Sequence, residues 1–129
     1  MKNEIGHIMR KYNVLEYKGP GDELSIDTLY KTLGYACLYK GYGKTINEIP
    51  ADELAVSLFR EAYPQKLFWE FERKGYVLEE KYPGIYYVSG NILFPVQIVV
   101  SSRLNRSRHS SLRILSANAD IEDIRKFLE

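Results

Sequence analysis

Two residues at the end of a short apolar run carry the groups that phosphodiester cleavage requires. Glu16 and Lys18 stand two positions apart, just before the glycine-rich loop 19–22. Side chains of a β-strand alternate between its two faces, so this spacing places both groups on one face. A carboxylate can hold a divalent cation, and an amine can stabilise charge at the attacked phosphate. A solvated strand face explains the pattern equally simply, because Glu and Lys are common surface residues.

A second candidate site is a basic cluster near the end of the chain. It is interleaved with serines and contains Arg103, Arg106, Arg108, His109 and Arg113. Guanidinium and hydroxyl donors together can bind a phosphate backbone, so Arg103, Arg106 and Arg108 are candidate nucleic-acid-binding residues. The alternative is a solvated segment that leads into a helix.

The remaining polar candidates give weaker signals. Gln97 interrupts the apolar run 92–100, and its amide could contact a phosphate or a base, although a buried glutamine paired with the backbone is more usual. His7 and His109 have no Cys, His or acidic neighbour at metal-ligand spacing. Residues 41–44 contain glycines and a lysine but lack the preceding strand of a phosphate-binding loop.

Helices and strands alternate in the hydrophobic pattern of the first hundred residues. Ser25 is a good N-cap, Pro64 suits the first position of a helix, and Gly75 is a natural helix end. The expected elements are a short helix within residues 3–12, for which a strand remains possible because Gly6 interrupts it, a strand at 13–18, a helix from 25 to about 40, a strand at 53–60, a helix at 64–75, a hairpin of strands 76–80 and 85–89, a strand at 92–100, and helices near 108–116 and from residue 120.

This order of elements predicts one α/β or α+β domain over residues 1–129, in which helices flank a mixed central sheet. The run 92–100 is apolar on both faces, so we expect a largely buried strand there. Pro95 lacks an N–H group, which predicts a bulge or a strand end beside it.

Composition excludes several classes of protein. The chain has 18 basic and 17 acidic side chains, so its net charge of +1 provides no global field that would attract nucleic acid or a membrane. Its single cysteine, Cys37, excludes an intrachain disulfide and a cysteine metal cluster. No apolar stretch approaches the roughly 18 residues of a membrane span, and residues 1–4 begin no secretory signal. We therefore expect a cytoplasmic protein with no membrane contact and no small-molecule cofactor.

The order of elements, together with three short runs, resembles the PD-(D/E)xK nuclease superfamily. A strand ending in Glu16-x-Lys18 is followed by a helix, a second strand, a second helix and further strands. Residues 12–18, 34–36 and 63–67 are similar to small uncharacterised bacterial proteins related to the Rpn and transposase-associated nucleases, and the similarity covers most of the chain. The resemblance implies a restriction-endonuclease-like fold and metal-dependent hydrolysis of DNA.

Carried over by position, the resemblance implies that Glu16 and the backbone carbonyl of Tyr17 ligate Mg²⁺, while Lys18 positions water or stabilises charge at phosphorus. The superfamily also takes an Asp or Glu from a preceding strand. Glu4 is the only carboxylate before Glu16 in this sequence. We expect the acid-bearing strand of the family to precede residue 3, so the metal site would be incomplete here.

The second carboxylate has several possible sources. Glu4 could reach the site, a second chain or an upstream segment could contribute, or Asp22, Glu23 or Asp27 could replace it. Without any of these, the chain would be inactive. The alternative function is then a non-catalytic module of the same fold that binds another protein or forms a homodimer through an exposed sheet edge.

Overall fold

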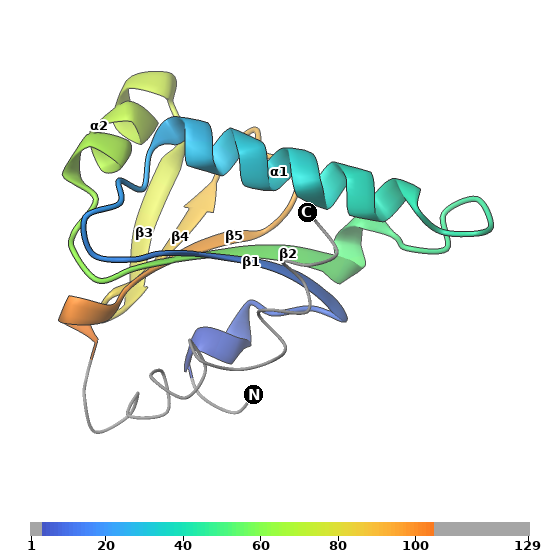
Figure 1. Cartoon of the computed structure of the whole chain (residues 1–129), viewed down its shortest axis with the longest axis horizontal. Coiled ribbons are helices and arrows are strands. Elements are labelled where there is room, and N and C mark those ends of the chain that lie inside the picture. Colours follow the sequence, from blue (N-terminus) through green and yellow to red (C-terminus); the bar gives the residue numbers. More distant parts are fainter. Residues whose placement is uncertain (1–3, 105–129) are drawn as a thin grey trace.

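The structure is a computed structural model that describes residues 4–104, and it contains a five-stranded mixed sheet with two α-helices. Figure 1 shows both helices on the same side of the sheet. In chain order the elements are the 3-10 helix η1 (Glu4–His7), β1 (Tyr12–Lys18), α1 (Ile26–Gly41), the 3-10 helix η2 (Ala51–Glu53), β2 (Leu54–Arg60), α2 (Gln65–Lys74), β3 (Val77–Tyr82), β4 (Ile85–Ser89), β5 (Val96–Val100) and the 3-10 helix η3 (Ser101–Arg103).

The strands lie in the order β1-β2-β5-β4-β3. Strands β1, β2 and β5 are parallel, whereas β4 runs antiparallel to both β5 and β3. The carboxyl ends of the three parallel strands therefore meet at one end of the sheet, on the left in Figure 1. We call this region the carboxyl end of the sheet. The mixed sheet with helices confirms the coarse fold class predicted from the order of elements.

The register of β1 against β2 determines which side chains share a face. Glu16 lies beside Leu58, and Lys18 lies beside Arg60. Alternate residues of a strand point the same way, so Val14, Glu16 and Lys18 project together. Val14 and Leu58 are both buried in the core that also contains residues of α1 and α2. Glu16 and Lys18 therefore project from the helix-covered face of the sheet.

The larger core fills the space between the sheet and the two helices. Four positions of α1 at the spacing i, i+3, i+4 and i+7 are buried, starting at Leu29 and ending at Ala36. The apolar spacing of residues 25–40 predicts that Tyr30 and Cys37 also face the core, which is wrong because both are exposed. The buried residues of α2 are Leu67, Phe68 and Phe71.

Local signals set the helix ends. The Ser25 hydroxyl accepts a hydrogen bond from the Thr28 N–H at 3.2 Å, and the Thr28 hydroxyl accepts one from the Ser25 N–H at 3.3 Å. This reciprocal capping box satisfies donors that the first turn of α1 leaves unpaired. Helix α2 ends at Gly75, whose φ of 84° favours glycine. Both ends confirm the predictions, although Pro64 is the N-cap residue of α2 instead of its first helical residue.

The opposite face of the sheet packs against η1. Its smaller core consists of Ile5, Leu15, Phe59, Ile85 and Val99. Gln97 is fully buried on this face, and its Nε2 donates to the Ile5 carbonyl and to the Ser57 hydroxyl, both at 2.8 Å. The interpretation of Gln97 as a buried residue paired with the backbone is confirmed. It ties η1 to the centre of the sheet.

Two predicted elements are shorter than expected. The short helix expected within residues 3–12 is a 3-10 turn that covers only Glu4–His7, and Tyr12 is the first residue of β1 instead of a helical residue. The strand predicted at 92–100 starts only at Val96, which confirms the strand end predicted beside Pro95, a residue with no N–H to donate. The Pro95 carbonyl still accepts a hydrogen bond from the Val56 N–H at 2.9 Å. The helices predicted near 108–116 and from residue 120 lie outside the described residues.

The described helices are also short or amphipathic. Within residues 4–104, none has both the length and the apolar character needed to cross a membrane.

Candidate functional site

The Glu16–Lys18 pair lies where its spacing predicted. Residues 12–18 form a strand, and both side chains are half-buried on its helix-covered face. Lys18 is the last residue of β1, and Gly19 begins the loop that leads toward α1. The structure therefore presents the carboxylate and the amine together at the carboxyl end of the sheet.

Arg60 is a functional candidate that sequence reasoning missed. It is the last residue of β2 and the register partner of Lys18. Neighbouring strands lie about 4.8 Å apart, so the stems of the two cations start side by side. Both side chains are half-buried, and neither has a salt-bridge partner in the described part of the chain. Adjacent like charges repel, so this pair concentrates positive charge that an anion would neutralise.

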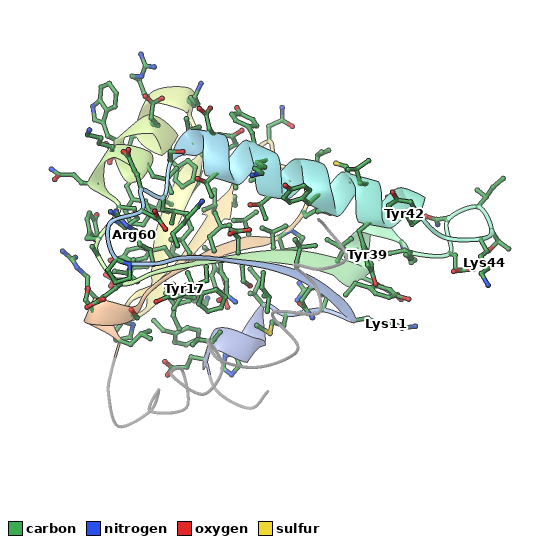
Figure 2. The ribbon with its side chains drawn as sticks, in the orientation of Figure 1. Lys11, Tyr17, Tyr39, Tyr42, Lys44 and Arg60 are labelled. Atoms are coloured by element: carbon green, nitrogen blue, oxygen red, sulfur yellow. The ribbon has the colours of Figure 1, made fainter. Side chains whose placement is uncertain are left out.

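A pocket of about 530 Å³ lies beside these cations. It is lined by residues 19–21 after β1, residues 60–63 after β2 and residues 102–103 in η3 after β5. Crevices outside the carboxyl ends of parallel strands are common ligand sites in α/β proteins. We call it the carboxyl-end pocket. Figure 2 shows Arg60 at this end of the molecule and Lys44 at the other.

Arg103 forms one wall of the pocket and is held by aromatic contacts. Its Cζ lies 4.0 Å from the centroid of the Tyr63 ring. That ring makes edge contacts with the buried Phe68 and Tyr86, at centroid distances of 5.0 and 6.1 Å. A guanidinium stacked on a fixed ring gains cation–π attraction and loses less freedom on binding a ligand. The stack therefore orients Arg103 at the pocket.

Of the three arginines predicted from the basic cluster, only Arg103 can be placed. Arg106 and Arg108 lie outside the described residues. Arg60 joins Arg103 in the pocket instead, because β2 and β5 are adjacent and parallel. The signal that could have found Arg60 is its position at the end of the second predicted strand, directly before a turn.

Glu4 and the side chain of Tyr17 lie away from Glu16. Glu4 is buried in η1, which packs on the opposite face of the sheet. Tyr17 alternates with Glu16 along β1, and its ring packs against the smaller core on that opposite face. The sheet therefore separates the expected pair of carboxylates, and η1 does not bring Glu4 to the face of Glu16.

The described residues do not complete the magnesium site that the resemblance implies. Within residues 4–104 no group of three or more His, Cys, Asp or Glu side chains could hold a metal ion. Mg²⁺ requires about six oxygen ligands, and Glu16 with the Tyr17 carbonyl would leave most of them to water. Asp22, Glu23 and Asp27 are exposed on the following loop and the first turn of α1. We therefore assign no metal-dependent step to these residues.

Three tyrosines near the antiparallel strands have perturbed acidity. Burial raises the pKa of Tyr86, whose ring contacts the pocket residue Tyr63, and the Glu80 carboxylate adds to the rise. Burial also raises the pKa of Tyr87. A side-chain hydrogen bond with Tyr30 raises the pKa of Tyr76. In all three cases the folded protein favours the neutral phenol.

We expect the free energy of unfolding to fall as the pH rises above about 10, the ordinary pKa of tyrosine. The stabilisation from these tyrosines is complete below that value, because the phenols are then neutral in both states. It is lost as the pH rises through the higher pKa values of the folded state. Urea unfolding between about pH 8 and 11.5 checks this, and a free energy that stays constant across the range would contradict it.

The carboxyl end of the sheet thus combines a Glu16–Lys18 pair, an adjacent Arg60, and a pocket with a stacked arginine. These features supply donors and positive charge suited to an anion. They are built from segments that are distant in sequence but follow three neighbouring parallel strands.

Comparisons with known proteins found no match: the chain matches no protein-family model, no curated protein and no solved structure.

Proposed function

We propose that this protein is a nuclease-like domain of the PD-(D/E)xK type that binds the phosphate backbone of DNA at the carboxyl end of its sheet. The observation that carries the proposal is the placement of Glu16 and Lys18 on one face at the end of β1, beside Arg60. Strands β1 and β2 are parallel and are connected through α1, and β1 contains Glu16-x-Lys18. This unit supports a restriction-endonuclease-like arrangement.

The charges at this end suit a nucleic-acid backbone. Lys18 and Arg60 are half-buried and adjacent, and Arg103 lies across the pocket. Each can bind a phosphate oxygen and release a counterion from DNA, which is the main source of affinity in backbone binding. Phosphate contacts fix position without reading sequence. We therefore propose binding with little sequence preference.

Hydrolysis would require a second carboxylate beside Glu16, which the described residues do not supply. Glu16 offers one carboxylate, and Glu4 is held on the other face of the sheet by η1. We propose that residues 4–104 bind DNA without cleaving it and that magnesium-dependent hydrolysis needs a second carboxylate from outside them. Plasmid cleavage by the full chain that persists in Glu16→Ala would remove Glu16 from this role.

Replacing Lys18 with alanine is expected to weaken the binding of duplex DNA about tenfold, since a charge-assisted hydrogen bond contributes about 1.5 kcal/mol. The slope of log affinity against log salt concentration should also decrease by about 1, because one fewer counterion is released. Fluorescence anisotropy over a range of salt concentrations measures both quantities.

Lys44→Ala is the matched control, because Lys44 is an exposed lysine at the opposite end of the molecule (Figure 2). It should leave the affinity and the salt slope close to those of the unmodified protein. Equal losses in both variants would mean that binding depends on overall charge, and the proposed site would then be wrong.

A second function is favoured by the position of β1. It is an edge strand, and among the described strands it pairs only with β2. An edge strand can pair with the same strand of a second copy. We propose a homodimer through β1 as this alternative, which predicts a concentration-dependent mass in sedimentation equilibrium. A monomeric mass at every concentration would exclude it.

A further inference from the structure

We propose that the carboxyl-end pocket binds a phosphate monoester of nucleotide size, either a free nucleoside monophosphate or the phosphorylated end of a nucleic-acid strand. The strand-end form rests on the DNA binding proposed above, whereas the free-nucleotide form does not. The pocket lies beyond Lys18 and is formed by three loops, so it is distinct from the Glu16–Lys18 pair on β1.

Lys18 and Arg60 are two half-buried cations that lie side by side. Lys18 and Arg60 are register partners, and neither has an acidic partner within residues 4–104. A partly desolvated cation without a counterion costs folding free energy, and the repulsion between the two adds to that cost. A bound anion would remove both penalties. Arg60 itself lines the pocket, so the compensating anion would lie there.

Arg103 is held at the pocket by its contact with Tyr63. Its guanidinium uses one face to contact the Tyr63 ring at 4.0 Å. The N–H donors of a guanidinium lie in its plane, and a side-chain hydrogen bond with Tyr86 uses part of this donor set, so the remaining N–H groups can bind a ligand. Planar, forked donors match the oxygens of a phosphate better than an ammonium group does. Arg60 and Arg103 belong to different lining segments, and both line the same pocket.

The charge of the pocket lining favours a phosphate monoester over a phosphate diester. The lining contains two arginines and one carboxylate, Glu61, with Lys18 directly beside Arg60. A phosphate monoester carries about 1.5 to 2 negative charges at neutral pH, whereas a diester carries about one. Two guanidiniums and a neighbouring ammonium outnumber the exposed Glu61 carboxylate, so the more highly charged group gains more net attraction although Glu61 also repels it more.

The size of the pocket favours a ligand larger than inorganic phosphate. The volume of about 530 Å³ falls within the range of small-molecule sites, which is about 300 to 1,000 Å³. A phosphate group fills only a small part of that space. Pro20, Ala62 and the Tyr63 ring also line the pocket and provide apolar surface for a sugar or a base.

Isothermal titration calorimetry on the full chain tests the pocket with adenosine monophosphate, adenosine and inorganic phosphate as probes. We expect adenosine monophosphate to bind at least tenfold more tightly than either adenosine or inorganic phosphate. Arg60→Met keeps an apolar stem and removes the charge, so it should weaken monophosphate binding at least tenfold. Lys44→Met at the far end of the molecule should leave it unchanged. Equal affinities for adenosine and its monophosphate, or an unchanged Arg60→Met affinity, would overturn the proposal.

Thermal unfolding distinguishes a ligand contact from a structural role. Without ligand, Arg60→Met should raise the melting temperature, because the repulsion with Lys18 disappears. With adenosine monophosphate present, the unmodified protein should gain melting temperature and Arg60→Met should gain little. If Arg60→Met does not fold, Arg103→Lys removes the forked donors and should also lower the affinity. An unchanged Arg103→Lys affinity in that case would overturn the proposal.

Oligonucleotides with and without a 5′-phosphate separate the two forms of ligand. Tighter binding of the phosphorylated strand, lost in Arg60→Met, supports the strand-end form. Binding of adenosine monophosphate without any binding of DNA would support the pocket and refute the proposed function. DNA binding with no response to adenosine monophosphate or to a terminal phosphate would refute the pocket and leave the proposed function standing.

Discussion

Replacing Phe71 with alanine is expected to lower the free energy of unfolding by about 3 to 5 kcal/mol, the usual cost of emptying a buried aromatic site. Phe71 is fully buried in α2 at the centre of the larger core. Its ring stacks on Phe68 at a centroid distance of 6.2 Å and meets Tyr76 edge-on at 5.7 Å. The side chains around it cannot all move inward, so a cavity would remain. Urea unfolding followed by circular dichroism measures the loss.

Trp69→Ala is the control on the same helix. Its side chain is larger than that of Phe71 but 57% exposed, and it contacts Arg73 at the surface. We expect this variant to cost less than about 1 kcal/mol. If Trp69→Ala destabilised the protein as much as Phe71→Ala, the core would not be where the structure places it.

Gly84→Ala is expected to cost about 3 kcal/mol, from a left-handed backbone and a close contact together. Gly84 has a φ of 78° in the turn between β3 and β4. A Cβ there would lie 2.9 Å from the Arg103 carbonyl carbon and 2.9 Å from the Val100 carbonyl oxygen. These neighbours are backbone atoms, so η3 would have to move. Chemical unfolding measures the cost.

Gly75→Ala separates the two contributions to that cost. Gly75 has a similar φ of 84°, but a Cβ there would have no neighbour within 4 Å. It should therefore lose only about 1 kcal/mol, the strain of the left-handed backbone. If both glycine variants lost the same stability, the close approach of the hairpin turn to η3 would be contradicted. The difference matters for the site, because η3 carries Arg103.

Local chemistry made much of the fold predictable. Ser25 with its capping box and Gly75 with its left-handed backbone mark helix ends that need no information from the rest of the chain. The alternation in β1 likewise placed Glu16 and Lys18 on one face, because side-chain direction in a strand follows from its period of two. These features depend on neighbours within a few residues.

Features that depend on long-range pairing were not predictable. Arg60 joins Lys18 only because β1 and β2 are adjacent and in parallel register. Arg103 reaches the same pocket because β5, reached through the β3–β4 hairpin, returns beside β2. Glu4 is kept from Glu16 by the packing of Ile5 on the opposite face. The spacing of residues along the sequence does not determine the order of the strands in the sheet, so it could not predict any of these three placements.

A backbone amide chemical-shift map of the full chain during titration with a short DNA duplex is the most direct test of DNA binding at the carboxyl end of the sheet. We predict that the largest shifts fall in residues 16–21 and 60–63 at that end, with residues 41–48 at the other end unaffected. Shifts concentrated around Lys44, or no shifts at a DNA concentration that saturates binding in anisotropy, would contradict the claim that this end of the sheet binds the phosphate backbone.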